Sequence, residues 1–238
     1  MNRALIFAGG TGQRMNSRAK PKQFLELHGK PIIIYTLEHF EAHPQIGDIT
    51  VVCVENWIPE FHHMLKWYGI EKVSRVVPGG DGGDHSIYNG LCAMEGFCQP
   101  DDIVLIHDGV RPLINGDLIS ANIDMTQERG NAITVEAAIE SVVRLDAEGR
   151  IQEVPPRKQM YTAKAPQSFR YGVILDLYRR ARREGVRSVD SAQLCSLYQV
   201  EMHTVRSTPN NMKITAPADY YMFRALYEAM ENQQILGI

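Results

Sequence analysis

Cysteine, long apolar runs and excess charge are scarce in this 238-residue chain, and each scarcity excludes a class of protein. The four cysteines form no C-x-x-C pair, which argues against both a zinc site and a disulfide framework. No apolar run approaches the roughly 20 residues that cross a bilayer, and the N-terminus lacks the charged-then-apolar order of a signal peptide. A net charge of −3 gives no electrostatic case for a nucleic-acid partner. We therefore expect a cytoplasmic protein that binds neither membranes nor nucleic acids.

Two common glycine-loop signatures are also missing. Counted from Gly10, the dinucleotide fingerprint G-x-G-x-x-G requires a small residue where the chain has Met15. No acidic residue stands about 20 residues further on at the end of a second strand, where a ribose partner belongs. The P-loop is absent as well, because no Gly-Lys-Ser/Thr follows the glycines. These absences count against an NAD-dependent oxidoreductase, which remains an alternative on the same type of sheet.

The chain is organised around its N-terminal segment. An apolar run at residues 4–8 breaks into Gly9-Gly10-Thr11-Gly12, which is typical of a buried strand that ends in a loop with exposed backbone N–H groups. Arg14, Lys20 and Lys22 follow closely, so positive charge is delivered where the amides already point. A plain strand-to-helix turn would explain the glycines but not the cations. We interpret this segment as a polyphosphate-binding loop.

In the first half of the chain, apolar runs alternate with helical stretches. The pattern predicts strands at residues 4–8, 49–54, 74–78 and 102–106, and helices at residues 31–43, at 59–68 and from Asp84, its N-cap. This order predicts an α/β fold with a Rossmann-like, doubly wound, mostly parallel sheet and helices on both faces. Because ligands bind beyond the carboxyl ends of such strands, the polar loops that follow the strands should gather at one edge.

The second half is less regular. The pattern predicts a strand at 133–139, helices at 171–184 and 190–198, a strand at 200–205, and a loop and strand edge at 211–215. A last helix starts at Pro217, with an apolar face that includes Met222, Ala225, Leu226, Ala229 and Met230. Turn and proline signals between residues 140 and 157 indicate an extended β-arm or hairpin. No linker or repeat divides the chain, so we expect one domain, residues 1–238.

Six short blocks of the sequence resemble the cytidylyltransferases of sugar-alcohol phosphates. They are Ala8 to Met15, Pro21-Lys22-Gln23-Phe24, Gly79-Gly80-Asp81 with Ser86, His107 to Pro112, Ala165-Pro166-Gln167 and Asn211 to Thr215. The blocks span nearly the whole chain in the family's order, which is far more specific than one glycine loop. The two best-known branches of this family transfer CMP from CTP to D-ribitol 5-phosphate, in teichoic acid and capsule synthesis, or to 2-C-methyl-D-erythritol 4-phosphate, in isoprenoid synthesis.

The resemblance implies that a phosphate oxygen of the acceptor attacks the α-phosphorus of CTP and that pyrophosphate leaves. Because both reactants are anions, the protein must position them and neutralise charge on the phosphoryl oxygens. By motif position, Arg14 and Lys22 resemble the residues that stabilise the transition state on the triphosphate. Lys213 resembles the residue that brings the acceptor phosphate to the α-phosphorus. For each cation the alternative is an exposed, solvated side chain.

The resemblance also implies a pocket that reads cytosine largely through backbone groups. The nucleotide-binding residues that it implies are Ala8, Gly9, Gly10, Thr11, Gly80, Asp81, Ser86 and Asp108. Ser86 has an alternative role in capping or packing the first turn of a helix. Asp108 faces either the ribose or a Mg²⁺ ion that bridges the phosphates. Arg111 either contacts the substrate or pairs with Asp108, and both interpretations stay open.

The arm, at about residues 138–160, carries Ser141 and Arg157, which the resemblance assigns to acceptor binding. In the family, the equivalent arginine reaches into the partner subunit and holds the acceptor phosphate. The resemblance therefore implies a catalytic role for Arg157 and a homodimer with exchanged arms. An exposed arginine beside Lys158 is the alternative interpretation.

Three positions depart from the family pattern. Gly83 stands where the family usually has an arginine, Ala165 replaces a threonine, and Asn210 or Asn211 stands near the place of an acidic residue. A polar contact near the nucleotide is therefore missing or replaced, and a non-catalytic nucleotide-binding module remains an alternative. The glycine loop and Val110 resemble the ribitol-phosphate branch, whereas the arm length fits the methylerythritol branch. Our prediction is ribitol phosphate.

Overall fold

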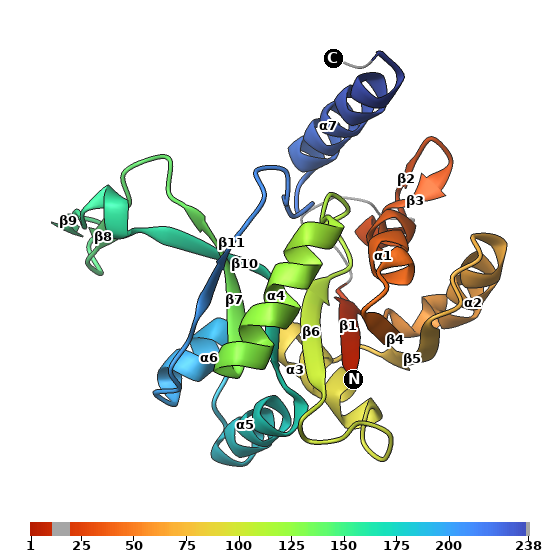
Figure 1. Ribbon diagram of the computed structural model, residues 1–238. Coiled ribbons are helices and arrows are strands. Elements are labelled where there is room, and N and C mark those ends of the chain that lie inside the picture. The colour runs from red at the N-terminus through yellow and green to blue at the C-terminus, as the bar shows by residue number, and fades with distance from the viewer. Residues whose placement is uncertain (11–19, 237–238) are drawn as a thin grey trace.

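The computed structural model describes residues 1–10 and 20–236, and at its centre lies a seven-stranded sheet in the order β11-β7-β10-β6-β1-β4-β5 (Figure 1). Four strands pair in parallel, namely β1 (Asn2–Ala8), β4 (Ile46–Cys53), β5 (Val73–Pro78) and β6 (Ile103–Asp108). Beyond β6, β10 (Tyr161–Arg170) runs antiparallel, and β7 (Asn131–Ala137) and β11 (Thr204–Arg206) follow as a parallel pair. The mostly parallel α/β sheet is confirmed.

Helices cover both faces of this sheet. One hydrophobic cluster joins residues of β1, β4 and β6 to α1 (Ile32–Ala42), α2 (Ile58–Trp67) and α4 (Gly116–Arg129). A second cluster joins the opposite face to α3 (Gly83–Ala93), α5 (Tyr171–Glu184) and α6 (Ser191–Leu197). Side chains of β1 alternate between the two clusters, with Ile6 in the first and Leu5 in the second. The sheet is therefore buried on both sides, as its continuous apolar runs predict.

A third cluster joins the C-terminal helix to the part of the chain around residues 22–35. It connects α7 (Pro217–Leu236) to α1 and to the hairpin of β2 (Glu26–Leu27) and β3 (Lys30–Pro31), next to the short helix η2 (Lys22–Phe24). Phe223 is fully buried and packs edge-on against Tyr35, with ring centroids 5.5 Å apart. The apolar face predicted for this helix is wrong, because Met222, Ala225, Ala229 and Met230 are exposed and only Leu226 of the five packs against the cluster.

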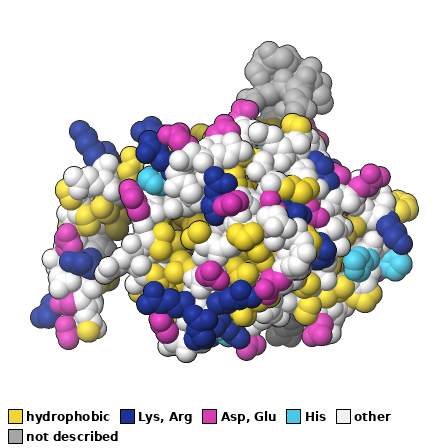
Figure 2. Space-filling view, turned by 60° about the horizontal axis from the view of Figure 1, so that its bottom comes forward, with side chains coloured by type: hydrophobic (Ala, Val, Ile, Leu, Met, Phe, Trp, Pro, Cys, Tyr) yellow, Lys and Arg dark blue, Asp and Glu magenta, His cyan; other side chains and the backbone are white. Residues whose placement is uncertain are grey.

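The predicted arm is present as a hairpin that stands away from the sheet (Figure 1). Strands β8 (Arg144–Leu145) and β9 (Ile151–Glu153) pair antiparallel, and the short helix η4 (Arg157–Gln159) leads back into β10. Figure 2 shows hydrophobic side chains on the arm, at the left of the molecule. In the arm, Ile139 is 86% exposed and Ile151 is 63% exposed. None of the helices in the described part of the chain is long and apolar enough to cross a membrane.

Several sequence-based expectations differ from the structure. The apolar pattern predicts neither α4 nor β10, and the strand expected at 200–205 is confined to β11. Residues 211–215 are described but belong to no helix or strand, so the expected strand edge there is wrong. The N-cap of α3 is Gly82 rather than Asp84, whose carboxylate pairs instead with Arg187.

Candidate active site

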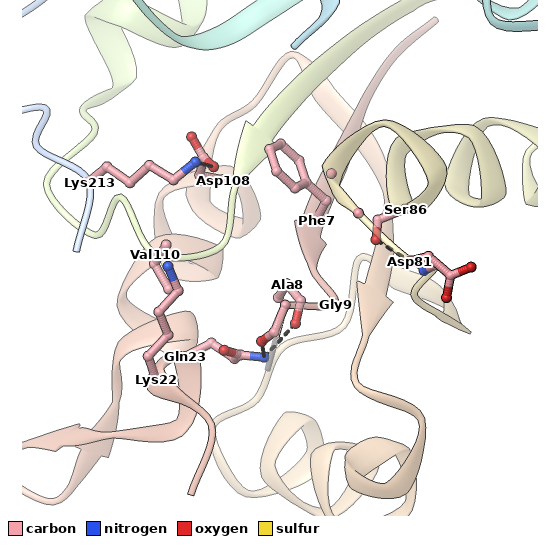
Figure 3. A pocket seen from close by; sticks show the side chains of 14 residues that line it. Phe7, Ala8, Gly9, Lys22, Gln23, Asp81, Ser86, Asp108, Val110 and Lys213 are labelled. Atoms are coloured by element: carbon pink, nitrogen blue, oxygen red, sulfur yellow. Dashed lines mark hydrogen bonds and ion pairs between the residues drawn. The ribbon is translucent and has the colours of Figure 1, made fainter. Parts of the chain in front are cut away.

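A cavity of about 500 Å³ lies at the carboxyl ends of the central strands (Figure 3). Its wall consists of residues 7–10 at the end of β1, residues 80–83 after β5, and Asp108 and Val110 at the end of β6. Its wall is completed by Lys22 and Gln23 of η2, by Ser86 of α3 and by Lys213, which precedes α7. The polar and glycine-rich loops thus gather at one edge of the sheet, as the sequence predicts.

The glycines allow the first two loops to approach each other closely. A Cβ on Gly9 would lie 2.9 Å from Gly79 Cα, and a Cβ on Gly80 would lie 2.5 Å from His85 Cβ. Ser86 Oγ accepts a hydrogen bond from the Gly80 N–H (3.1 Å) and also lines the cavity. Ser86 therefore combines a structural role at the start of α3 with a position at the cavity wall.

Gln23 and Lys22 connect the N-terminal loop to other parts of the cavity. Gln23 is 1% exposed, and its side-chain amide donates hydrogen bonds to the carbonyl oxygens of Ala8 and Gly10. Lys22 Nζ donates to the Ile214 carbonyl oxygen at 3.1 Å, which places its ammonium next to the segment that carries Lys213. The motif around Lys22 therefore positions the loop as well as supplying charge.

Asp108 lies between two cations at the end of β6. Its Oδ1 pairs with Lys213 Nζ, and its Oδ2 accepts a hydrogen bond from Arg111 Nε at 2.8 Å. Burial favours the neutral acid, but Lys213 and Arg111 outweigh it and lower the pKa of Asp108 to about 2. The carboxylate is therefore ionised at neutral pH. The pairing of Arg111 with Asp108 is confirmed.

A second cavity of about 260 Å³ adjoins the first and shares Phe7, Gly83, Asp108 and Lys213 with it. Its other polar lining includes Arg111, Lys164, Gln167 and Asp190. The cations Arg111 and Lys164 both donate to the carbonyl oxygen of Asn211, at 3.0 and 3.4 Å. Asp108 and Lys213 thus stand at the junction of the two cavities, and charged side chains of both signs line the second one.

The remaining site residues predicted from sequence lie elsewhere. Thr11 and Arg14 fall outside the described residues. Ser141 and Arg157 are exposed in the arm and line neither cavity of their own chain. Arg157 Nη1 donates to the Ile139 carbonyl oxygen within the arm (3.4 Å). Their predicted roles in acceptor binding stay predictions.

The sequence profile of IspD, 2-C-methyl-D-erythritol 4-phosphate cytidylyltransferase, matches residues 3–228. The chain belongs to this cytidylyltransferase family. It is accordingly a CTP-dependent nucleotidyltransferase, and the two adjoining cavities fit an enzyme with two substrates.

Similar sequences fall into both named branches. Ribitol-5-phosphate cytidylyltransferases of Streptococcus agalactiae serotype Ia and of Vibrio parahaemolyticus are each 46% identical, with all of both chains covered. A 2-C-methyl-D-erythritol 4-phosphate cytidylyltransferase of Clostridium botulinum is 33% identical, with 96% of this chain and 98% of the relative covered. The solved 4-diphosphocytidyl-2C-methyl-D-erythritol synthase of Anaerococcus prevotii has the same fold, with a TM-score of 0.83, 23% identity, and coverage of 95% of this chain and 96% of that one.

The cytidylyltransferase family is generally dependent on a divalent metal, and the donor set of this chain fits an ion that is bound mainly by substrate. Among the described residues, no group of three or more His, Cys, Asp or Glu side chains could hold a metal ion. Asp108 offers one ionised carboxylate at the cavity wall. Mg²⁺ in nucleotide sites typically takes one or two carboxylates and completes its shell with phosphates and water.

Three residues in or near this cytidylyltransferase site are not among the site residues inferred from the sequence. Lys164 pairs with Glu136 and lines the second cavity, but a lone lysine in a strand carries no signal in the sequence. His107 is fully buried beneath the site, where burial lowers its pKa to about 3 and keeps it neutral. Arg187 reaches the start of α3 from a segment 103 residues away.

Proposed function

We propose that this enzyme transfers CMP from CTP to D-ribitol 5-phosphate, which yields CDP-ribitol for teichoic acid or capsule synthesis and releases pyrophosphate. The observation that carries the proposal is the pair of cavities that meet at Asp108 and Lys213. The choice of acceptor is supported by full-length relatives at 46% identity whose name specifies ribitol 5-phosphate. The alternative acceptor is 2-C-methyl-D-erythritol 4-phosphate, which the family profile names.

CTP occupies the first cavity in this proposal. Backbone groups of residues 8–10 and 80–81 read the cytosine together with Ser86, and the triphosphate lies towards Lys22. Thr11 and Arg14 extend this site according to the resemblance. The small residues Ala8, Gly9, Gly10 and Gly80 leave their backbone groups accessible to the cytosine ring. The hydrogen bonds from Gln23 hold the loop in place before the nucleotide binds.

The acceptor phosphate enters from the second cavity, with Arg111 and Lys213 on its path. One of its oxygens forms a bond to the α-phosphorus, and the bond from that phosphorus to the pyrophosphate oxygen breaks. Lys22, Lys213 and Arg14 neutralise the charge on the phosphoryl oxygens, which is greatest in the transition state. No proton has to be abstracted from an ionised phosphate, so the residues position charge and need not act as bases.

The divalent metal in this proposal is Mg²⁺, with Asp108 as its protein ligand. When bound, the ion would neutralise phosphate charge and orient the triphosphate. Asp108 also holds the Lys213 ammonium towards the cavity through their ion pair. The Asp108 carboxylate would thus direct both the Lys213 ammonium and the Mg²⁺ ion towards the phosphates of CTP.

We further infer a homodimer of single nucleotidyltransferase domains, residues 1–238, that exchange their arms at about residues 138–160. Apolar side chains along the arm are exposed, among them Ile139, Ile151 and Val154. An exposed apolar segment of this kind marks a surface that another chain covers. In the dimer, Ser141 and Arg157 reach the acceptor site of the partner. We place this enzyme in the cytoplasm, where CTP is made.

Pyrophosphate release tests the proposed reaction. The full chain is incubated with Mg²⁺ and CTP, and ribitol 5-phosphate and methylerythritol 4-phosphate are offered separately. We expect release that depends on the acceptor and is fastest with ribitol 5-phosphate. CTP binding without turnover on either acceptor would instead support a non-catalytic module. Equal rates with ATP or UTP would contradict the cytosine-reading role of Ser86 and the glycine loops.

A further inference from the structure

Arg187 joins two segments that line different cavities. It lies between α5 and α6, and its guanidinium makes a bidentate ion pair with Asp84 in the first turn of α3, with Nη2 to Oδ1 at 3.0 Å. The Asp84 side chain is only 10% exposed, whereas that of Arg187 is 56% exposed. Burial favours the neutral form of Asp84, but the hydrogen bonds from Arg187 prevail and lower its pKa.

The same guanidinium lies directly on the nucleotide loop. A Cβ on Gly82 would lie 2.9 Å from Arg187 Nη2, so the arginine packs against the backbone at this position. Gly82 and Gly83 line the first cavity, and Gly83 also lines the second. An arginine from a distant part of the chain therefore contacts the loop that lines both cavities.

The segment that carries Arg187 continues into the wall of the second cavity. Val189, Asp190 and Ser191 line that cavity, and the Val189 carbonyl oxygen is 3.8 Å from the Cβ position of Gly83. Asp190 caps α6 by accepting the Gln193 N–H (2.8 Å). Its other oxygen accepts from Gln167 Nε2 (3.0 Å). The segment is thus fixed at α6 and, through Arg187, at the nucleotide loop.

We propose that the Asp84–Arg187 pair couples the two substrate cavities, so that a nucleotide bound against residues 80–83 also orders residues 186–191 for the acceptor. Arg187 is then a positioning residue that acts through the loop and the segment. This inference rests on the proposed function, because it takes the first cavity as the CTP site and the second as the acceptor site.

The chemistry of the pair favours arginine at position 187. A guanidinium makes two parallel hydrogen bonds to a carboxylate and fixes its orientation, whereas a lysine ammonium makes a point contact. Because Arg187 is half-exposed, the expected effect is moderate. Loss of the ion pair should loosen the contact between residues 80–83 and residues 186–191 without unfolding the chain.

Steady-state kinetics test the coupling. We expect Arg187→Ala to raise the KM for the polyol phosphate by about three- to tenfold while kcat at saturation changes less than about twofold. Arg187→Lys should fall between this variant and the wild type. Arg183→Ala, at an exposed arginine near the end of α5, is the matched control and should match the wild type. Unchanged KM values in Arg187→Ala would refute the proposal.

Hydrogen exchange with CTP as the only added ligand gives a test that is independent of turnover. In the wild type, CTP should slow exchange both in residues 80–86 and in residues 186–191. In Arg187→Ala, CTP should slow exchange in residues 80–86 only. Protection of residues 80–86 alone in the wild type would overturn the coupling while leaving the CTP site intact. Absence of protection in residues 80–86 would show that the proposed function, on which the coupling rests, has the nucleotide in the wrong cavity.

Discussion

At the scale of single residues, the active site depends on a carboxylate that two cations hold in place. Asp108 contacts Lys213 with one oxygen and Arg111 with the other, which leaves the three side chains with a net charge of +1. Arg111 is almost buried and also bonded to Asn211, so it is fixed. Lys213 is 37% exposed and lies where the two cavities meet. The lysine is therefore the member of the group best placed to contact a phosphate.

Substitution of the cavity lysines tests this assignment. We expect Lys213→Ala and Lys22→Ala each to lower kcat/KM by about 100-fold or more, because each removes a positive charge that acts on the transferring phosphoryl group. Thermal melting should change little, since the Lys213 side chain is 37% exposed and not part of the core. Lys66→Ala, at an exposed position near the end of α2, serves as the control. A fully active Lys213→Ala or Lys22→Ala variant would contradict the role given to that lysine.

At the scale of elements, the close approach of α3 to the sheet sets the position of the nucleotide loop. A Cβ on Gly90 would lie 2.4 Å from Leu5 Cδ1 and 2.8 Å from Val52 Cγ2, both in buried strands. A side chain at position 90 would therefore push α3, and Ser86 with it, away from β1 and β4.

Gly90→Ala should therefore lower the free energy of unfolding by about 1–3 kcal/mol, the usual effect of overpacking a dense core. The measurement is urea denaturation followed by circular dichroism. Gly116→Ala is the matched control, because the nearest atom to its Cβ would be 3.7 Å away, an ordinary contact. Equal stability of the two variants would indicate that α3 moves freely on the sheet.

The start of α7 fixes the segment that carries Lys213. Asp219 Oδ2 accepts hydrogen bonds from Thr215 N–H (2.7 Å), Thr215 Oγ1 (2.6 Å) and Ala216 N–H (2.8 Å). Burial raises the pKa of Asp219, but these hydrogen bonds outweigh it and the pKa falls below its ordinary value of 3.8. A carboxyl with a lowered pKa stabilises the fold above that ordinary value, and this contribution is lost as the pH falls below it.

Asp219→Asn should therefore lower the melting temperature at pH 7, and the difference from the wild type should shrink as the pH falls below about 4. Thermal melting between pH 3 and pH 7 measures both effects. Lower activity at pH 7 is also expected, because Thr215 and Ala216, which follow Lys213 in the chain, lose their hydrogen bonds to an ionised carboxylate. A difference in melting temperature that is constant across this range would show that ionisation of Asp219 does not contribute.

The elements that the sequence predicts well are those with simple apolar patterns. The parallel strands β1, β4 and β6 contain continuous apolar runs, and α5 has a clear polar and apolar face. Helix α4 escapes prediction because its buried side includes the polar residues Asn122 and Thr126, which interrupt the period of 3.6. Strand β10 escapes because Pro166 and an irregular register between Ala163 and Gln167 interrupt the alternation.

The short motifs identified candidate residues that the fold brings to one place. Ser86, Asp108 and Lys213 line the first cavity, and their roles in binding and catalysis stay predictions. Arg187 and Lys164 were not predictable, because their partners Asp84 and Glu136 are distant in sequence and only the folded sheet brings them together. Sequence also left the role of Arg111 open, since both alternatives place it near Asp108.

At the scale of the whole molecule, we expect a dimer in which the arm of each chain contributes to the active site of the other chain. Light scattering should give twice the chain mass of 26.9 kDa. Ile151→Asp with Val154→Asp should lower the mass to that of one chain, because charges replace exposed apolar side chains in the arm. Val173→Asp, which changes an exposed valine on α5, should leave the dimer intact. A monomeric wild type would refute the exchange of arms.

Mixed dimers test whether the partner's arm completes the site. Lys213→Ala and Arg157→Ala variants should each be nearly inactive alone. After unfolding and refolding together, about a quarter of wild-type activity should return. The reason is that half of the dimers are mixed and each mixed dimer has one site with both residues intact. No recovery would place Arg157 in the site of its own chain, and an active Arg157→Ala variant would place it outside catalysis.

The identity of the acceptor is the central claim, and a competition assay tests it most directly. The enzyme is given Mg²⁺, CTP and equal concentrations of ribitol 5-phosphate and methylerythritol 4-phosphate, and the two CDP-alcohols are separated by mass. The ratio of the products then equals the ratio of the two kcat/KM values. We predict at least about tenfold more CDP-ribitol, which corresponds to about 1.4 kcal/mol in transition-state binding. A product that is mainly CDP-methylerythritol would contradict the assignment.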